Sequence, residues 1–384
     1  MEDETCHVHR RLNVDAPSPA DRLAPFLFVR SLRPFATALC PPGSRPSSST
    51  SAAVRSRLER RLRDHYARQA HPAAAHDCHE QAAQDMIWLA EAARPHGPAS
   101  DAVLEGFVRA IVDQDKPLAY VLGTQPFHPL RHPLLVRPPT LIPRPETEHW
   151  VSLLAARLVS SPAPAPAHSP APAHSPAPLR LLDIGTGTGC IALALSAALA
   201  HVGRPAHATA VDRAPAALAL AAENAARQGL SARVDVREAD LFCPSFVDHL
   251  DLAHDNRFDL VVSNPPYITR AEYATLDASV RAWEDRGALV GEQAAGSGAG
   301  ADDDDDDGLV FYRRIVSLLD TLLSPPVREP GPVPVVAFEV GHAQARAVER
   351  LLLAWRGAGG TTLETEVVLD PWGVERAVFA RWKP

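Results

Sequence analysis

A short apolar run that leads directly into closely spaced glycines constrains the fold of this chain more than any other feature. Leu179–Ile184 predicts a buried strand, Gly185–Gly189 reads Gly-Thr-Gly-Thr-Gly, and Ile191–Leu199 predicts a helix. Glycines let a backbone approach a ligand closely, and the free N–H groups of a helix start can donate to it. A dinucleotide-binding turn would have Gly-x-Gly-x-x-Gly, and Cys190 stands where its third glycine belongs. The segment therefore predicts a ligand-binding turn of another class.

The remainder of the chain after residue 179 alternates predicted strands with predicted helices, which is typical of an α/β fold with a parallel sheet. The last two strands are expected to pair with each other. The predicted strands are Leu179–Ile184, Ala206–Val211, Arg233–Arg237, Phe258–Ser263, Val333–Val340, Leu363–Leu369 and Ala377–Trp382. The predicted helices are Ile191–Leu199, Ala214–Gln228 with Gly229 as its C-cap, Gly308–Leu323 and Gln344–Trp355.

The N-terminal part of the chain predicts a leader and a small helical domain. From Arg22 to Arg63 there are many arginines, no lysine and one acidic residue, which is typical of an organelle transit peptide. We therefore expect residues 1–51 to be a mitochondrial leader, with plain disorder as the alternative. Residues 52–116 predict a helical substrate-recognition domain, in which Val54, Leu58 and Leu62 are spaced for one helix face.

A predicted linker and two predicted inserts separate the remaining parts. Residues 117–150 mix short β-prone pieces with prolines, which predicts a hairpin-like linker before a catalytic domain at 151–384. The hexapeptide Ala-Pro-Ala-His-Ser-Pro occurs twice in tandem, so residues from about 160 to 178 predict an extended insert. Six consecutive aspartates predict a second, solvated and disordered insert at about 294–307.

Charge and composition exclude several classes of protein. A net charge of −8 argues against bulk phosphate neutralisation, so we expect no stable nucleic-acid partner. The cysteines form no Cys-x-x-Cys pair, which argues against a disulfide framework. His71, His76, Cys78 and His79 match no structural zinc spacing, and we predict no metal site. We also expect no membrane span, because no apolar run is long enough.

Carboxylates follow three of the predicted strands, as in nucleotide-binding folds. Asp183 ends the strand before the glycine turn. Asp212 follows the next strand, where it can accept hydrogen bonds from two ribose hydroxyls. Asp240 follows the third strand and can accept from an adenine amino group, while Leu241 covers the ring.

The turn Asn264-Pro265-Pro266-Tyr267, directly after the strand Phe258–Ser263, determines the predicted chemistry. An amide nitrogen is a poor nucleophile because its lone pair is delocalised. The Asn264 side-chain oxygen and the Pro265 carbonyl can accept both N–H bonds and direct the lone pair, while Tyr267 can stack on the flat group. Because the two prolines stiffen the turn, catalysis is expected to come from positioning rather than from a strong base.

These motifs resemble those of a broad class of enzymes and, more specifically, those of one family within that class. The glycine turn preceded by Asp183 resembles the cofactor loop of class I S-adenosylmethionine-dependent methyltransferases. Over about residues 80–384, apart from the inserts, the chain resembles the HemK/PrmC protein-glutamine N5-methyltransferases. The segments that carry this resemblance are Tyr120–Phe127, Leu141–Glu148, Asn264–Tyr267, Val280–Glu284 with Ala288-Leu289, Gly308–Tyr312, Phe338–Gly341 and Asp370–Arg376.

The resemblance implies a fold, an enzyme and a site. The fold would be the class I methyltransferase α/β fold, with a seven-stranded, mostly parallel sheet whose last strand is antiparallel, and with a small N-terminal helical domain. The enzyme would use S-adenosyl-L-methionine to methylate N5 of the glutamine in the Gly-Gly-Gln loop of a class 1 peptide chain release factor. The implied cofactor-binding residues are Asp183, Gly185, Thr186, Gly187, Gly189, Asp212, Asp240, Leu241 and Asn264. The implied substrate-binding residues are Phe127, Pro143, Arg144, Glu146, Asn264, Pro265, Pro266 and Tyr267, and the last four are also the implied catalytic residues.

The Arg-rich leader and the two inserts further predict a mitochondrial, fungal-type member that acts as a monomer in the matrix, with a cytoplasmic location as the alternative. Two other functions remain open. Asn-Pro-Pro-Tyr turns also occur in enzymes that methylate exocyclic amines of adenine or guanine, although those need a basic face or a base-flipping domain. A non-catalytic scaffold with a methyltransferase fold is the third hypothesis, and the intact glycine turn and Asn264 argue against it.

Overall fold

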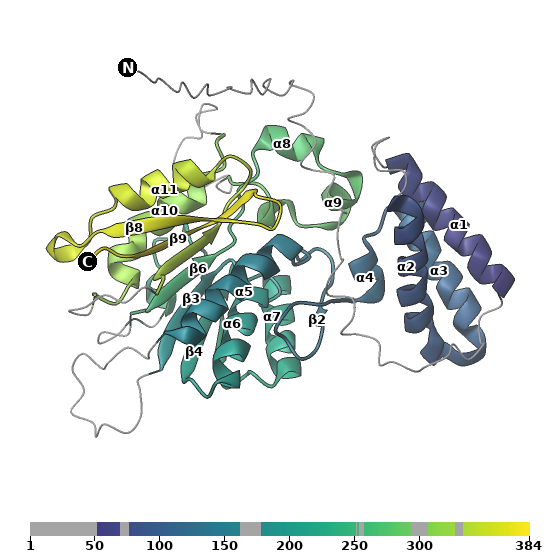
Figure 1. Cartoon of the computed structure of the whole chain (residues 1–384), viewed down its shortest axis with the longest axis horizontal. Coiled ribbons are helices and arrows are strands. Elements are labelled where there is room, and N and C mark those ends of the chain that lie inside the picture. The colour runs from purple at the N-terminus through teal and green to yellow at the C-terminus, as the bar shows by residue number, and fades with distance from the viewer. Residues whose placement is uncertain are drawn as a thin grey trace, which may run out of the picture. The chain divides into compact units, whose positions relative to one another are not determined.

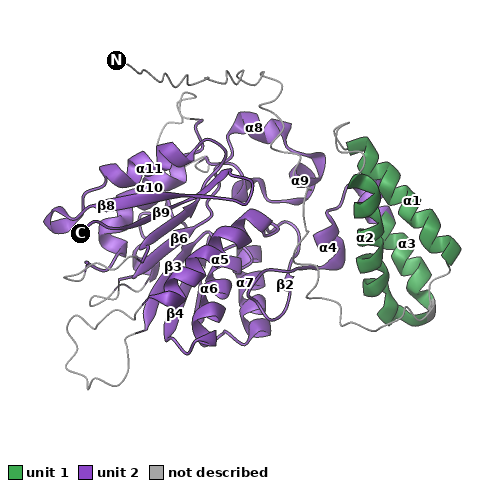
Figure 2. Ribbon diagram, in the orientation of Figure 1, with its two compact units in different colours: residues 1–108 green, residues 109–384 purple. Residues whose placement is uncertain are grey.

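A computed structural model of the chain describes residues 52–69, 77–161, 178–250, 252, 257–292, 306–326 and 333–384. The expected leader, most of both expected inserts, and His71 and His76 lie outside these residues. The chain divides into two compact units, residues 1–108 and 109–384 (Figure 2). No helix in the described ranges has the length and apolar character needed to cross a membrane.

The first unit is built from helices α1 (Ala52–Gln69) and α2 (Asp77–Ala93), the 3₁₀ helix η4 (Arg94–Ala99) and the first part of α3 (Ser100–Gln114). The predicted apolar face of α1 is confirmed at Leu58 and Leu62, which are fully buried. A polar pair joins α1 to α2, in which the hydroxyl of the half-buried Tyr66 donates to Oδ2 of the buried Asp85 at 2.6 Å.

The second unit is organised around a seven-stranded sheet with the strand order β5-β4-β3-β6-β7-β9-β8 (Figure 1). Strands β5, β4, β3, β6 and β7 are parallel neighbours, and β9 pairs antiparallel with both β7 and β8. The predicted, mostly parallel sheet with an antiparallel last strand is therefore confirmed. The strands are β3 (Leu179–Ile184), β4 (Ala206–Asp212), β5 (Val234–Glu238), β6 (Leu260–Ser263), β7 (Val336–Glu339), β8 (Leu363–Leu369) and β9 (Glu375–Trp382).

Helices cover both faces of this sheet, which explains why most residues of its central strands are apolar. Helices α5 (Pro145–Ser160), α6 (Cys190–His201) and α7 (Pro215–Gln228) pack on one face, and α10 (Val310–Leu322) and α11 (Ala345–Ala354) pack on the other (Figure 1). Successive residues of a strand point to opposite faces, so Leu181 joins the first core cluster and Leu182 the second. The shorter helices are η5 (Asp248–Leu250), α8 (Arg270–Thr275), α9 (Ala278–Trp283), η6 (Arg286–Ala288) and η8 (Ala358–Gly360).

Local capping signals account for several element boundaries. Helix α7 begins with Pro215 in its first turn and ends at Gly229, whose φ of 70° is left-handed, as the sequence predicted for its C-cap. Thr269 begins α8 with a capping box, because its side chain accepts from the Glu272 N–H while the Glu272 side chain accepts from the Thr269 N–H.

In the linker, the predicted hairpin-like pairing is accompanied by helices that the sequence did not predict. It contains a short helix α4 (Leu118–Leu122) and an antiparallel pair of strands, β1 (Thr124–Gln125) and β2 (Leu134–Leu135). The next helix, α5, starts at Pro145, inside the segment assigned to the linker. Proline is favoured at a first helical position, and the acidic residues that follow stabilise the helix N-terminus. The first turns of this helix were therefore included in the predicted hairpin-like linker.

The end of the aspartate run also differs from its prediction as a solvated, disordered insert. The described chain resumes at Asp306, which accepts from the Arg270 backbone N–H at 2.9 Å. Asp307 accepts from the Leu309 backbone N–H at 2.9 Å and pairs with Arg313. Asp306 therefore contacts the start of α8 and Asp307 the start of α10, so these two aspartates do not belong to a wholly solvated insert.

Candidate active site

The predicted site residues meet at one edge of the sheet, where the parallel strands have their carboxyl ends. Strand β3 lies between β4 and β6, so the chain crosses to opposite sides of β3 at this point. Ligands of open α/β sheets bind in the crevice at such a switch point. Asp183, Asp212, Asp240 and Asn264 lie at or just after the ends of β3, β4, β5 and β6, respectively.

The glycine turn has the conformation that only glycine adopts readily. Gly185, Gly187 and Gly189 have φ values of 74°, 56° and 83°. A Cβ added at Gly185 or Gly187 would meet no described atom within 4 Å, so the turn has an open side. A Cβ at Gly189 would lie 3.1 Å from Leu193 Cδ1, so this glycine also allows the helix to pack closely. The open side of the turn fits a ligand that lies against the backbone.

Asp183 is completely buried beneath this turn. Its Oδ2 atom accepts from the Thr186 hydroxyl at 2.7 Å and from the Ala192 N–H at 3.2 Å. Its Oδ1 atom has no hydrogen-bond partner within the described part of the chain. Burial raises the pKa of Asp183 to about 7 despite the opposing hydrogen bond from Thr186. A buried acceptor that has no hydrogen-bond partner among the described residues, on a carboxyl group that ionises near neutral pH, fits a cationic group of a bound cofactor.

The raised pKa of Asp183 predicts a specific pH dependence of stability. An unfolded aspartate has a pKa of about 3.9, so folding favours the neutral form; this stabilisation is complete below about pH 4 and is lost as the pH rises through about 7. We expect the free energy of unfolding of the wild type to fall, relative to Asp183→Asn, by about 2 to 3 kcal/mol between about pH 5 and pH 7. Urea unfolding of both proteins at several pH values measures this, and parallel pH profiles would contradict it.

The other two carboxylates are placed as the sequence predicted with respect to the strands. Asp212 Oδ2 accepts from the Gly187 N–H and Oδ1 from the Ala214 N–H, both at 2.9 Å, so Asp212 is fastened to the glycine turn. Asp240 is half-buried, and its Oδ1 accepts from the Phe242 N–H at 2.9 Å. Leu241 is buried in the second core cluster. Each carboxylate oxygen has two lone pairs, so both groups can accept further bonds from a ligand.

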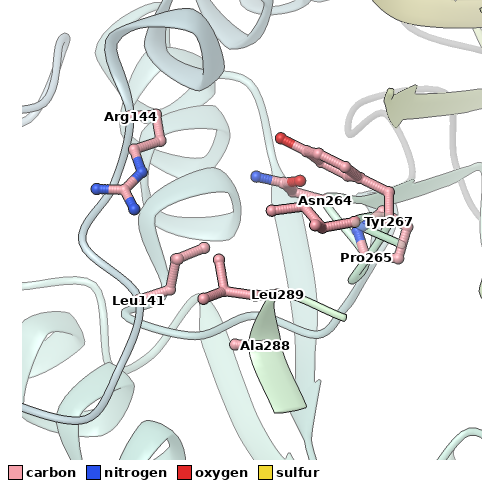
Figure 3. Close-up of a pocket in the computed structure, with 8 residues that line it drawn as sticks. Leu141, Arg144, Asn264, Pro265, Tyr267, Ala288 and Leu289 are labelled. Atoms are coloured by element: carbon pink, nitrogen blue, oxygen red, sulfur yellow. The ribbon is translucent and has the colours of Figure 1, made fainter. Parts of the chain in front are cut away.

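The Asn264–Tyr267 turn lines a small pocket beside this edge (Figure 3). Strand β6 is tied to β3 just before the turn, because the Ser263 hydroxyl donates to the Ile184 carbonyl at 2.7 Å. Figure 3 shows the side chains of Asn264 and Tyr267 lying next to each other above Pro265. Apolar side chains form most of the remaining wall. The residues that line the pocket are Leu141, Arg144, Asn264, Pro265, Tyr267, Ile268, Ala288 and Leu289.

Three glycines and a glutamine hold the backbone of this turn in place. A Cβ at Gly291 would lie 2.9 Å from the Pro266 carbonyl oxygen, and a Cβ at Gly308 would overlap the Tyr267 carbonyl oxygen. A Cβ at Gly341 would lie 2.8 Å from Tyr267 Cδ2. The Gln344 amide donates to the Tyr267 carbonyl at 3.0 Å and accepts from the Gly341 N–H at 3.0 Å. Pro266 itself is not among the residues that line this pocket, so its predicted role stays a prediction.

A buried carboxylate that the sequence analysis did not single out lies behind the turn. Glu339 ends β7 and is only 3% exposed. Its Oε2 atom accepts from Thr147 Oγ1 at 2.6 Å and from Trp150 Nε1 at 2.8 Å, and its Oε1 atom lies 3.4 Å from the Tyr267 hydroxyl. The Asn264 amide nitrogen donates to Thr147 Oγ1 at 3.4 Å. Burial raises the pKa of Glu339, although the bonds from Thr147 and Trp150 oppose that shift.

Arg144 belongs to the pocket wall, but its guanidinium group already forms an ion pair with Glu284. Its Nη2 atom contacts both oxygens of Glu284, at 2.7 and 2.8 Å, and the Glu284 side chain is 1% exposed. Glu284 also accepts from the Ile142 N–H at 3.2 Å. In Figure 3 the Arg144 guanidinium points away from Asn264. Arg144 therefore joins the segment before α5 to the segment after α9.

The other predicted substrate residues lie outside the pocket. Phe127 is 4% exposed and belongs to the core cluster that contains Leu134 and Trp150, and its role in substrate binding stays a prediction. Pro143 is buried directly before Arg144. Glu146 lies in the first turn of α5, 3.9 Å from Arg376.

Comparisons with known proteins agree with this geometry. A family model described as a methyltransferase domain matches residues 177–288. A release factor glutamine methyltransferase of Geobacter sulfurreducens is 35% identical over 288 residues, which cover 75% of this chain and 81% of that protein. One of Chlorobaculum tepidum is 35% identical over 67% of this chain and 71% of its own length. A solved human methyltransferase 10 domain containing protein has a TM-score of 0.37 at 18% identity, over 65% of this chain and 89% of that one, which is too weak to bear on function.

The sheet order, the glycine turn and its carboxylates, and relatives that match most of their own length point to one conclusion. The chain is an S-adenosyl-L-methionine-dependent methyltransferase and belongs to the release factor glutamine methyltransferase family.

Proposed function

We propose that this enzyme methylates N5 of the glutamine in the Gly-Gly-Gln loop of a class 1 peptide chain release factor. The observation that carries the proposal is the pocket at Asn264 and Pro265, in which amide and carbonyl acceptors stand among apolar walls. An uncharged, flat group with two N–H bonds suits such a pocket, because polar groups in apolar sites need exact partners. The substrate named for the relatives is a release factor glutamine, which has such a group.

The proposed chemistry follows from the hydrogen bonds that these acceptors form with a substrate amide. The Asn264 side-chain oxygen and the Pro265 carbonyl accept the two N–H bonds and direct the nitrogen lone pair toward the donor. When bound, S-adenosyl-L-methionine supplies a methyl group on a positively charged sulfur. A nitrogen–carbon bond forms as the carbon–sulfur bond breaks, the electron pair goes to sulfur, and one amide proton leaves to water. Positioning and fixed dipoles account for the rate enhancement.

The cofactor would bind along the carboxyl ends of β3, β4 and β5. The residues of the turn, Gly185, Thr186, Gly187 and Gly189, would face its methionine portion together with Asp183. Asp212 would accept from the ribose hydroxyls and Asp240 from the adenine amino group, with Leu241 beside the ring. The open side of the turn and the unpartnered Asp183 oxygen support this assignment.

The release factor is proposed to be mitochondrial, with the enzyme in the matrix. The support is the arginine-rich segment between Arg22 and Arg63, which has a single acidic residue. A fusion of this chain to a fluorescent protein tests the location. Co-localisation with a matrix marker that is lost when residues 1–51 are removed is the expected result, and a uniform cytoplasmic signal would contradict it.

Substrate class is tested by offering the purified enzyme labelled S-adenosyl-L-methionine with a mitochondrial class 1 release factor, or with DNA or RNA. The control substrate is the same release factor with the Gly-Gly-Gln glutamine changed to alanine. Label is expected in the unchanged release factor alone. Label in nucleic acid instead would establish exocyclic amine methylation. Tight cofactor binding without transfer to any of these would also overturn the release-factor assignment, and no cofactor binding at all would indicate a scaffold.

A further inference from the structure

The oxygen and the NH₂ group of an asparagine side chain have opposite hydrogen-bonding roles, so the rotation of the Asn264 side-chain amide matters at this site. The oxygen accepts hydrogen bonds, whereas the NH₂ group only donates them. Asn264 serves an amide substrate only if its oxygen meets the N–H bonds of that amide. A rotation of the Asn264 amide by half a turn would point its NH₂ group at the NH₂ group of the substrate. Because both groups only donate, the pocket would then repel the amide that it should bind.

Glu339 determines what the Thr147 hydroxyl can do. The Glu339 side chain is buried, and its Oε2 atom lies 2.8 Å from the Trp150 indole nitrogen and 2.6 Å from Thr147 Oγ1. An indole N–H can only donate, so Glu339 Oε2 acts as an acceptor, and in the structure the Thr147 hydroxyl donates to this same oxygen. The Thr147 hydroxyl must therefore give its single proton to Glu339, which leaves only lone pairs on Thr147 Oγ1.

An oxygen that can only accept fixes the rotation of its next neighbour. Asn264 Nδ2 lies 3.4 Å from Thr147 Oγ1. With the hydroxyl proton committed to Glu339, the Asn264 NH₂ group can bond to Thr147 and its oxygen cannot. We propose that Thr147, oriented by Glu339, is a positioning residue that turns the oxygen of Asn264 toward the substrate amide.

The same carboxylate also reaches the other side chain of the turn. Glu339 Oε1 lies 3.4 Å from the Tyr267 hydroxyl, and the buried Tyr312 hydroxyl donates to the Glu339 backbone carbonyl at 2.7 Å. One residue at the end of β7 thereby sets the orientation of Tyr267 directly and of Asn264 through Thr147. Helix α5 takes part because Thr147 and Trp150 are one turn apart on its buried side.

This inference rests on the proposed function, and its kinetic test uses a pair of variants. Thr147→Val keeps the shape of the buried side chain and removes the hydroxyl, whereas Thr147→Ser keeps the hydroxyl. Loss of one orienting hydrogen bond predicts an about tenfold lower kcat for Thr147→Val. KM for the release factor and Kd for S-adenosyl-L-methionine should stay within about twofold, and Thr147→Ser should restore kcat. A Thr147→Val enzyme with wild-type kcat would overturn the proposal.

A second measurement does not depend on any substrate. In protein with ¹⁵N-labelled asparagine side chains, the Asn264 NH₂ signals are those missing from Asn264→Ala. We expect a nuclear Overhauser effect between these protons and the Thr147 methyl group. Its absence would overturn the proposed orientation. If the wild type transfers no methyl group to a release factor but shows this effect, the proposed function fails while the orientation of Asn264 stands.

Discussion

Replacing Asn264 by alanine is expected to lower kcat about 100- to 1000-fold, because it removes a fixed acceptor that acts on the reacting amide. The Pro265 carbonyl remains, so the amide would still enter but could turn within the pocket. KM for a release factor should change much less, since most of that contact must lie outside this small pocket. Steady-state methylation rates measure both constants, with the circular dichroism spectrum and the thermal unfolding midpoint as controls for folding.

A kcat within about tenfold of the wild type would contradict the role given to Asn264. Asn264→Asp sharpens the test, because it keeps an oxygen at this position but adds charge and removes the NH₂ group that bonds to Thr147. A larger rate loss in Asn264→Ala than in Thr147→Val is also expected. The first change deletes the acceptor, whereas the second only frees its rotation.

Gly308→Ala is expected to be the most damaging substitution outside the turn itself. An added Cβ would overlap the Tyr267 carbonyl oxygen and come within 2.6 Å of Gln344 Nε2, so the turn or the start of α10 must move. The left-handed φ of 68° adds strain for any residue other than glycine. We expect the free energy of unfolding to fall by about 4 kcal/mol or more and methylation to be lost.

The chain offers a matched control for this substitution. Gly359 has a similar φ of 71°, but a Cβ there would meet no described atom within 4 Å. Gly359→Ala should therefore show only the conformational cost, about 1 to 2 kcal/mol, with unchanged methylation. Equal effects of the two substitutions would mean that the contact between Gly308 and Tyr267 is unimportant.

The architecture was largely predictable because it depends on signals that are local in sequence. Apolar runs located the sheet strands to within a few residues, and Gly229 marked the end of α7. The positions of Asp183, Asp212 and Asn264 followed from the rule that parallel strands present their carboxyl ends at one edge. The start of α5 was not predicted because the prolines up to Pro145 favoured a hairpin-like linker, although proline also begins helices.

The residues behind the site were not predictable in the same way, because their roles depend on distant contacts. Thr147 and Glu339 are far apart in sequence and meet only when α5 packs against the end of β7. Glu339 did carry one usable signal, since it is an acidic residue at the end of a buried strand, like Asp212. Gln344 gave none, because its contact with the Tyr267 carbonyl requires α11 to begin beside the turn.

The most direct test of the account is to locate the transferred methyl group. A mitochondrial class 1 release factor would be treated with S-adenosyl-L-methionine and either the wild-type enzyme or Asn264→Ala, then digested and sequenced by tandem mass spectrometry. The account predicts a single added methyl on the side-chain nitrogen of the Gly-Gly-Gln glutamine, present with the wild type and nearly absent with Asn264→Ala. A methyl group on another residue, or equal methylation by both enzymes, would contradict it.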